Sequence, residues 1–419
     1  MRSQRSDVIL LFSTRTLRLF AYGFVSVVLA LYLAQVGFGS GQIGLIFSLA
    51  LAGDAAISLW LTTSADRFGR RRTLLTGALL MIAAGIVFTL ARNWAVLAVA
   101  AIIGVISPSG HEIGPFLSVE QASLTQLLPD ARRTQVFAWY NLAGSFAAAA
   151  GALAGGWLAQ GLQGTGVTVL ASYRAVLAGY VVAGILLAVL FLFVSPAVEV
   201  PPPRGGAARR QKPDGPVFLG LHRSRRVVFS LSALFAMDAF AGALIVQSFM
   251  AYWFQVRFGV ATGVIGTIFF ATNILAGLSA LLAAWLARRI GLINTMVFTH
   301  IPSSLFLMLV PLMPTLPLAA GFLILRASIS QMDVPTRQSY TMAVVEPDER
   351  SAASGVTTIA RSVGAAASRV LSGIFLSSAL LFNLPFFLAG CLKITYDILL
   401  YFRFRALKPP EEMEAGNRA

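Results

Sequence analysis

Ser64-Ala65-Asp66-Arg67-Phe68-Gly69-Arg70-Arg71-Arg72 lies between two long apolar stretches of this chain. An acid, a turn glycine and several arginines are too costly to place in hydrocarbon, so this stretch indicates a short aqueous loop between two membrane helices. A fainter copy, Ala287–Gly291, follows about 220 residues later. A loop repeated at about half the chain length is typical of internally duplicated membrane transporters.

The composition agrees with a membrane protein. Apolar residues make up 57% of the chain and charged residues only 12%, whereas an ordinary soluble domain has roughly 25% charged residues. Apolar stretches of about 20 residues, long enough to cross a bilayer, recur along nearly the whole sequence. We therefore predict an all-α membrane protein with twelve transmembrane helices, arranged as two six-helix pseudo-symmetric halves. The predicted spans are residues 8–36, 42–62, 73–91, 94–118, 134–160, 171–195, 226–255, 261–287, 291–313, 316–344, 351–377 and 379–404.

Two further repeats indicate that the first six spans correspond in sequence to the last six. Pro129–Arg132 recurs as Pro347–Arg350, and Glu120–Ser123 is echoed by Arg337–Tyr340, both at an offset of about 220 residues. We predict an N-terminal half at residues 1–196, a flexible linker rich in Pro, Gly and basic residues at 197–225, a C-terminal half at 226–405 and a polar tail at 406–419.

The net charge of +15 could indicate a nucleic-acid binder, but its distribution argues for topology instead. If the amino terminus is cytoplasmic, the external loops contain only Arg92, Arg174 and Arg257, and most basic residues fall in cytoplasmic segments. We expect a multi-pass protein of the inner or plasma membrane with both termini cytoplasmic. Its expected partners are the lipid bilayer and a small-molecule substrate, with no nucleic acid, and it is expected to be a monomer.

Metal and cofactor sites are not indicated. Cys391 is the single cysteine, so the chain can form no internal disulfide. The histidines at 111, 222 and 300 are scattered, which argues against a Cys/His metal cluster. We expect no cofactor, only a coupling ion, with the proton as the leading candidate.

The loop at residues 62–74 resembles the loop 2–3 motif of the major facilitator superfamily, Gly-x-Leu-Ala-Asp-Arg-x-Gly-Arg-Lys followed by Leu. The matching residues are Ala65, Asp66, Arg67, Gly69, Arg70 and Leu74, with Arg71 in place of the Lys; Thr62 and Ser64 depart from the motif. The resemblance covers the whole chain and implies a secondary transporter that works by alternating access. It also implies a conformational-switch motif, formed by Asp66, Arg67, Gly69, Arg70 and Arg71.

Within that family the chain is most similar to drug/proton antiporters, although two of their signatures differ here. Ala100 occupies the place of their span 4 arginine, and Gly151–Gly156 keeps the glycines of their span 5 signature without its proline. Such small residues also let helices pack closely whatever the substrate. We expect proton-coupled efflux of amphipathic or drug-like compounds. The alternative is a transporter of a small organic or inorganic anion.

Other classes of protein fit less well. The sequence has no paired histidine ligands, no nucleophile elbow and no phosphate-cradling glycine loop, so a membrane enzyme is not expected. An ATP-driven pump would need a nucleotide-binding domain from a partner. A receptor or scaffold that does not transport would be distinguished by the absence of solute flux in liposomes.

Ionisable residues inside the spans indicate a polar cavity. Each costs roughly 2.5–3.5 kcal/mol at the bilayer centre, so most must pair, reach an interface or face water. Arg18 and Asp238 fall at corresponding depths in spans 1 and 7 and could oppose one another, as a proton-linked pair or as a static one. Glu112 lies between Pro108 and Pro115, where we predict a kinked or broken helix. The candidate proton and substrate path comprises Asp238, Glu112, Asp333, Arg18, Asp54, Arg326, Arg361 and Arg369.

For the arginines of span 11 two interpretations stay open, and other polar residues in the spans are expected to have structural roles. Arg361 and Arg369 share a face of span 11 and could meet an anionic substrate or neutralise neighbouring acids. His300 is expected to be a satisfied polar residue rather than a proton carrier. Four residues near the cytoplasmic ends of spans are expected to extend to the interface: Arg15, Glu120, Arg337 and Asp397.

Overall fold

The computed structural model describes residues 4–110, 116–128, 130–199, 221, 223–346, 349–377 and 381–407. The chain divides into two compact units, and the first of them draws on both halves of the sequence. Unit 1 comprises Met1–Pro202, Val246–Ile274 and Arg369–Ala379. Unit 2 comprises Pro203–Ile245, Leu275–Ser368 and Leu380–Ala419.

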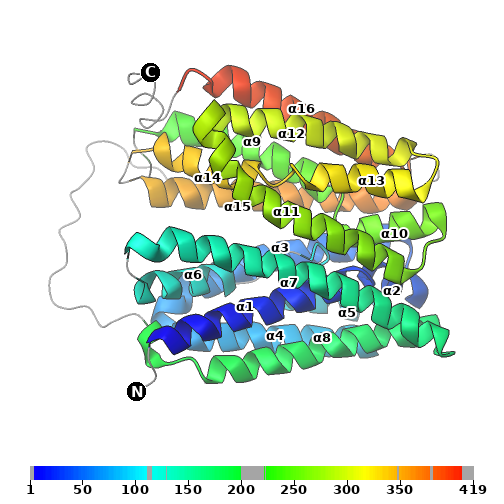
Figure 1. Ribbon diagram of the computed structural model, residues 1–419. Coiled ribbons are helices and arrows are strands. Elements are labelled where there is room, and N and C mark those ends of the chain that lie inside the picture. Colours follow the sequence, from blue (N-terminus) through cyan, green and yellow to red (C-terminus); the bar gives the residue numbers. More distant parts are fainter. Residues whose placement is uncertain are drawn as a thin grey trace. The chain divides into compact units, whose positions relative to one another are not determined.

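Helices account for most of the described residues (Figure 1). The first half contains α1 (Gln4–Ser26), α2 (Leu29–Val36), α3 (Ser40–Phe68), α4 (Arg70–Leu90), α5 (Trp94–Ile103), α6 (Phe116–Leu127), α7 (Asp130–Gly164), α8 (Val169–Leu192) and the short 3-10 helix η1 (Pro196–Val198). The second half contains α9 (Arg225–Ala243), α10 (Gln247–Phe258), α11 (Thr262–Ile290), α12 (Leu292–Leu309), η2 (Val310–Leu312), α13 (Leu316–Ala327), α14 (Asp333–Ala343), α15 (Arg350–Ser377) and α16 (Leu384–Phe404).

These helices correspond to the predicted spans. Among the described residues, 8 helices are long and apolar enough to cross a membrane, and α5 and α13 are shorter apolar helices. The helices α3, with 29 residues, and α15, with 28, cover the predicted spans 42–62 and 351–377. The protein is therefore a multi-pass, all-helical membrane protein.

Four predicted spans are interrupted. Span 4 breaks between α5 and α6, as the prolines and glycines around Glu112 predicted, although residues 111–115 themselves lie outside the described residues. The spans predicted as continuous at 8–36, 226–255 and 316–344 are also divided, into α1 and α2, α9 and α10, and α13 and α14. The expectation of continuous helices was wrong there. Gly242 precedes the break between α9 and α10, and Pro335 lies in the first turn of α14, whereas the break between α1 and α2 has no proline or glycine beside it.

Small residues allow a close helix contact in unit 1. Helices α1 and α7 pack along their length, and a Cβ atom on Gly151 or Gly155 would lie 2.0 Å from the carbonyl oxygen of Phe20 or 2.1 Å from that of Phe24. Only glycine permits such an approach, because any side chain would overlap backbone atoms. The packing interpretation of the Gly151–Gly156 signature is thus confirmed.

The core of unit 2 lies where α9, α12, α14 and α16 meet. Phe235 of α9 packs with Met296 of α12, Tyr340 of α14, and Tyr396 and Leu400 of α16 in one buried apolar cluster. Helices α12 and α16 run side by side in Figure 1, and their contact is among the most extensive in this unit. The apolar cluster adjoins the polar groups described below, with the Phe235 ring against Arg337 and the Tyr396 ring against His300.

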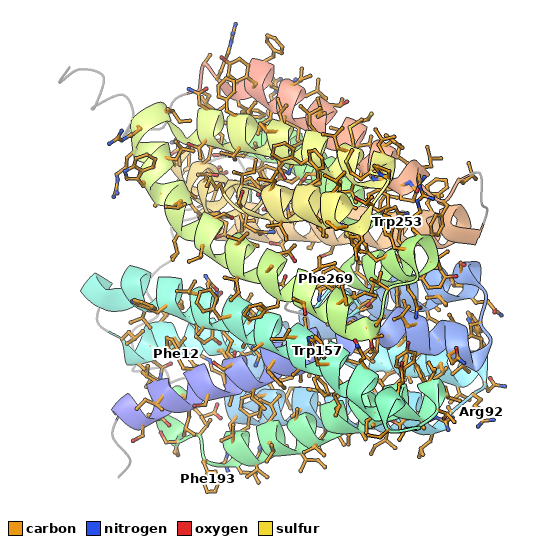
Figure 2. The ribbon with its side chains drawn as sticks, turned by 45° about the vertical axis from the view of Figure 1, so that its right-hand side comes forward. Phe12, Arg92, Trp157, Phe193, Trp253 and Phe269 are labelled. Atoms are coloured by element: carbon orange, nitrogen blue, oxygen red, sulfur yellow. The ribbon has the colours of Figure 1, made fainter. Side chains whose placement is uncertain are left out.

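The outward faces of several helices are apolar. Leu90, Phe193, Leu186 and Val182 expose between 50% and 73% of their surface. Figure 2 shows Phe193 projecting away from the end of α8. Exposed apolar side chains along membrane-length helices match a helix bundle whose outer surface faces a bilayer.

Candidate functional site: a buried charge network

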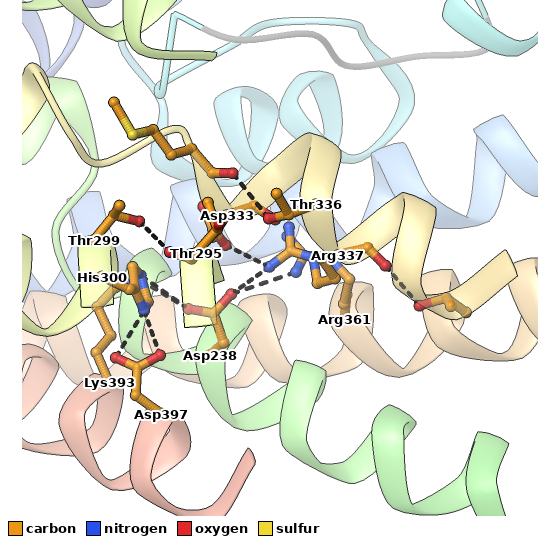
Figure 3. A network of polar contacts seen from close by, with 12 residues as sticks. Asp238, Thr295, Thr299, His300, Asp333, Thr336, Arg337, Arg361, Lys393 and Asp397 are labelled. Atoms are coloured by element: carbon orange, nitrogen blue, oxygen red, sulfur yellow. Dashed lines mark hydrogen bonds and ion pairs between the residues drawn. The ribbon is translucent and has the colours of Figure 1, made fainter. Parts of the chain in front are cut away.

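Asp238, on α9 of unit 2, is the centre of a charge network (Figure 3). Its Oδ2 atom lies 3.0 Å from Nη1 of Arg337 on α14 and 3.4 Å from Nη1 of Arg361 on α15. Its Oδ1 atom accepts a hydrogen bond of 2.8 Å from Nζ of Lys393 on α16. A single carboxylate therefore ties cations from three other helices together. We call the set Asp238, His300, Asp333, Arg337, Arg361, Lys393 and Asp397 the Asp238 network.

Asp333 and Arg337 form the second acid–base contact of the network. They lie four residues apart on α14, on one face of the helix, and Arg337 Nη1 donates to Asp333 Oδ2 at 2.9 Å. The same guanidinium nitrogen also contacts Asp238, so Arg337 links the two carboxylates. Like-charged carboxylates this close to one another are stable because a cation lies between them.

His300 of α12 joins the network through both ring nitrogens. Nδ1 lies 3.0 Å from each carboxylate oxygen of Asp397, and Nε2 lies 3.1 Å from Nζ of Lys393. Asp397 and Lys393 are four residues apart on α16, so this helix presents an acid and a base to the imidazole on one face. His300 is satisfied by hydrogen bonds, as expected, but its partners are titratable.

The network is buried and close to charge balance. With His300 neutral, the carboxylates of Asp238, Asp333 and Asp397 balance the cations of Arg337, Arg361 and Lys393. Arg361 is the most exposed of the cations, with 35% of its side chain accessible against 8% for Arg337 and 10% for Lys393. Burial at low dielectric makes each loss of a partner costly, so the groups must rearrange together.

Unit 1 contains a simpler charged pair. Arg18 of α1 binds Glu120 of α6 through two hydrogen bonds of 2.8 and 2.7 Å, and both side chains are fully buried. The hydroxyl groups of Thr14 and Tyr140 also donate to the Glu120 carboxylate. The guanidinium carbon of Arg18 lies 4.5 Å from the centre of the Phe116 ring. Sealed from solvent and fully satisfied, this pair is suited to holding helices together.

The two ion pairs occupy corresponding places in the sequence repeat, with opposite polarity. Arg18 corresponds to Asp238 and Glu120 to Arg337, at offsets of about 220 residues. The first half thus has its base on span 1 and its acid on span 4, while the second half has the acid on span 7 and the base on span 10. Arg18 and Asp238 each bind a partner of their own unit, and their opposition across spans 1 and 7 stays a prediction.

The expectation that four residues extend to the interface was also wrong. Glu120 and Asp397 are fully buried, Arg337 is 6% exposed, and Arg15 is 6% exposed with its Nε donating to the carbonyl oxygen of Tyr140. Their positions near predicted helix ends suggested that these side chains reach the membrane interface. In the structure they are buried and bind partners on other helices instead. The repeat holds a signal for the two ion pairs: it aligns Glu120 with Arg337 and Arg18 with Asp238, so each half has an acid and a base at the same two places.

Other candidate path residues have different surroundings. Asp54 is half-buried on α3. Arg326 is half-buried in the last turn of α13, and its buried Nε atom has no hydrogen-bond partner among the described residues. Glu112 lies outside the described residues, and Arg369 belongs to α15 with its side chain outside the described ones. Lys393 and Asp397, which were not candidates, are core members of the network.

The loop between α3 and α4 binds the end of α8. Gly69 has φ of +99°, a conformation that favours glycine and turns the chain directly from α3 into α4. Arg71 donates to the carbonyl oxygens of Phe191 and Leu192 at 3.2 and 2.6 Å, so it satisfies acceptors at the C-terminus of α8. The side chains of Asp66 and Arg67, at the end of α3, lie outside the described ones.

A carboxylate caps the helix that follows this loop. Glu199 accepts hydrogen bonds from the backbone nitrogens of Arg70 and Arg71, the first residues of α4. In unit 2, Glu349 accepts from the nitrogens of Arg223 and Ser224 ahead of α9. Negative charge at a helix N-terminus is favourable because backbone N–H groups and the helix dipole both point to it.

Comparisons with known proteins identify the family. The sequence profile of the Major Facilitator Superfamily matches residues 11–368 and 258–419. The chain belongs to this superfamily and is a secondary transporter, not an enzyme. It is 30% identical to an uncharacterized membrane protein of Saccharomyces cerevisiae, YJR124C, over 95% of this chain and 94% of that protein.

Solved structures share the fold at low sequence identity. A bacterial homolog of the human lysosomal transporter Spinster, in an inward-facing and occupied conformation, matches with a TM-score of 0.74 at 18% identity, covering 97% of this chain and 98% of that one. A D-xylose-proton symporter matches with a TM-score of 0.70 at 13% identity, covering 94% of this chain and 97% of that one. These likenesses define the fold.

Proposed function

We propose that this protein couples transport of a small solute to proton movement, with the Asp238 carboxylate as the group that exchanges a proton for its cations. The observation that carries this is the contact of one buried carboxylate with Arg337, Arg361 and Lys393. A proton on Asp238 would remove the counter-ion that these cations share. The helices that carry them must then rearrange, which links protonation to conformation.

The placement of titratable groups supports coupling in the second half of the chain. In the Asp238 network, the imidazole of His300, the amine of Lys393 and the carboxylate of Asp397 lie next to the Asp238–Arg337 ion pair. The corresponding Arg18–Glu120 pair is fully buried. Intramembrane ionisable residues are retained chiefly where they serve ion or substrate paths. The fold accommodates such coupling, since one structural neighbour is a D-xylose-proton symporter.

Solute accumulation in proteoliposomes tests this function. A growth-inhibition panel that compares a deletion strain with an overexpressing strain first identifies a transported compound. Asp238→Asn should then abolish accumulation driven by a pH gradient but retain exchange of labelled for unlabelled compound, because exchange needs no net proton movement. Gradient-driven accumulation that persists in Asp238→Asn, Asp333→Asn and Glu112→Gln alike would rule out these carboxylates as the proton path.

The leading substrate class is amphipathic, drug-like compounds of little or no charge, moved outward as an antiporter would. Charge balance supports this class: with His300 neutral, the acids and cations of the Asp238 network compensate one another. A balanced network leaves no full charge for an ionic substrate to neutralise.

A small anion is the second candidate, and the exposure of Arg361 favours it. Its contact with Asp238, at 3.4 Å, is the longest of that carboxylate's contacts with Arg and Lys, and 35% of the side chain is accessible. Such a guanidinium could bind a carboxylate or phosphate through paired hydrogen bonds that lysine cannot reproduce. If the substrates are amphipathic, Arg361→Lys and Arg369→Lys should each keep most transport. Selective loss of an anionic substrate in both variants would favour the anion instead.

For localisation, we propose the inner or plasma membrane, with both termini and the linker at 197–225 cytoplasmic and the protein acting as a monomer. The scarcity of basic residues in the predicted external loops supports this orientation. Reporter fusions at each terminus, one active only in the cytoplasm and one active only outside it, test it. External activity of either terminal fusion would reverse the orientation.

A further inference from the structure

The imidazole of His300 has a defined hydrogen-bond direction. An ammonium group can only donate and an ionised carboxylate can only accept. Lys393 Nζ therefore donates to Nε2 at 3.1 Å, and Nδ1 donates to Asp397 at 3.0 Å. Both contacts require the same neutral tautomer, with its proton on Nδ1.

These contacts form one continuous path of hydrogen bonds. It runs from Asp238 to Lys393 at 2.8 Å, from Lys393 to His300 at 3.1 Å, and from His300 to Asp397 at 3.0 Å. Figure 3 shows these residues adjoining one another, with the imidazole in the middle. All of these side chains are at most 10% exposed, so water does not compete along the path.

The surroundings of His300 contain a small set of charged and titratable groups. Lys393, Tyr396 and Asp397 reach it from α16, with the Tyr396 ring edge-on at 5.9 Å between ring centres. Asp238 of α9 lies 3.8 Å from Nε2. The neighbouring helices also carry Asp333 and Arg337 on α14 and Arg326 on α13. The direct polar partners of the imidazole are thus all able to gain or lose a proton.

We infer that Asp397, His300 and Lys393 form a proton relay that switches the Lys393–Asp238 ion pair on and off, an inference that rests on proton coupling at Asp238. In one passage Lys393 gives a proton to Nε2, and Nδ1 gives its proton to Asp397. The result is a neutral amine, the opposite imidazole tautomer and a protonated carboxyl group, so protons and charge balance. Asp238 then keeps Arg337 and Arg361 but loses its ionic contact with Lys393.

The internal repeat provides a comparison without a relay. Spans 3 and 6 correspond to spans 9 and 12, which carry His300, Lys393 and Asp397. Arg174 of α8 falls near the place of Lys393, but the places of His300 and Asp397 fall on apolar residues near positions 80 and 177, and residues 73–90 of α4 and 175–192 of α8 contain no Asp, Glu, His, Lys or Arg. A relay is not needed to stabilise this type of ion pair, since Arg18 and Glu120 pair without one. The additional groups of unit 2 therefore call for a role beyond packing.

Infrared difference spectroscopy tests the relay without a known substrate. The reconstituted protein is cycled between neutral and acidic buffer. Acidic buffer favours the passage because Asp238, with one cation fewer beside it, then takes up a proton more readily. The C=O stretch of the protonated carboxyl group of Asp397, which is fully buried, is followed. Wild type should show a band that Asp397→Asn removes and His300→Gln also removes. Glutamine can keep both hydrogen bonds but cannot take up and release a proton. Thr299→Val is the matched control. Among the described residues, the Thr299 hydroxyl donates to the carbonyl oxygen of Thr295 in its own helix at 2.8 Å and to no member of the network, so this variant should leave the band unchanged.

A band that is absent from wild type, or that persists in His300→Gln, would overturn the relay. If His300→Gln fails to fold, nitrogen-15 spectra of the intact chain, with His111 and His222 replaced by Gln, give the same decision. His300 should then show the tautomer protonated on Nδ1 at neutral pH and convert to the other tautomer on acidification. A fixed tautomer would contradict the relay. Failure of proton coupling itself is separate, because it appears as gradient-driven accumulation in Asp238→Asn.

Discussion

At the scale of single residues, the Arg18–Glu120 pair shows that a buried ion pair is costly to break but replaceable. Arg18→Met leaves the Glu120 carboxylate buried with only hydroxyl donors, so we expect a loss of about 3–5 kcal/mol in the free energy of unfolding. Arg18→Met combined with Glu120→Leu removes both charges and should recover most of that loss. Thermal unfolding in detergent, followed as a double-mutant cycle, measures the coupling. Additive losses in the double variant would contradict a paired structural role.

At the scale of helices, glycines at one contact decide how closely α1 and α7 approach. Gly155→Ala would place a methyl group 2.1 Å from the carbonyl oxygen of Phe24, so we expect a destabilisation of about 1–3 kcal/mol. Gly161 lies on the same helix, and a Cβ atom added there would have no neighbouring atom within 4 Å, so Gly161→Ala is the matched control. It should be neutral or stabilise α7 by up to about 1 kcal/mol. Equal melting temperatures of the two variants would show that α1 and α7 can separate at no cost.

A second prediction at this scale concerns Asp66, at the end of α3 beside the loop between α3 and α4. Arg70 and Arg71 fix the loop to the ends of neighbouring helices, with Arg70 Nη1 bound to Gln126 at 2.9 Å. In this family the aspartate of the motif is expected to act on the conformational equilibrium, so Asp66→Asn should sharply slow transport while folding and substrate binding stay near normal. Arg72→Gln, at an exposed position in the first turn of α4, is the control. Unchanged transport rates for Asp66→Asn in proteoliposomes would refute this role.

At the scale of the whole molecule, the inverted polarity of the two ion pairs allows one symmetric experiment. Exchanging charges by Arg18→Glu with Glu120→Arg, or by Asp238→Arg with Arg337→Asp, keeps an acid opposite a base in each unit. The first exchange should retain much of the transport. The second should lose proton-driven accumulation, because Lys393 would then face an arginine. Equal transport by both double variants would place the coupling outside the Asp238 network.

The helical fold and the pairing of spans in the repeat can be predicted from the sequence more fully than the site. Hydropathy is enough to identify membrane spans, because each must satisfy its own backbone in hydrocarbon. Partner choice depends on helix rotation and on contacts between distant helices, which hydropathy does not encode. For this reason the sequence indicates Asp238 as a candidate, but it places its partner Arg337 at the interface and gives Lys393 no role. The break at 244–246 follows Gly242, but a single glycine in an apolar run does not by itself predict a break.

The division of span 7 has a consequence for how the protein is made. α9 belongs to unit 2 and α10 to unit 1, where Ser248 donates to the carbonyl oxygens of Ser26 and Pro108 at 2.6 Å. These acceptors in unit 1 therefore have no Ser248 donor until the ribosome has synthesised some two hundred residues beyond Ser26. A nascent chain released at the linker would carry six spans but an unfinished unit 1, so co-translational insertion of the first half cannot by itself complete a folded domain.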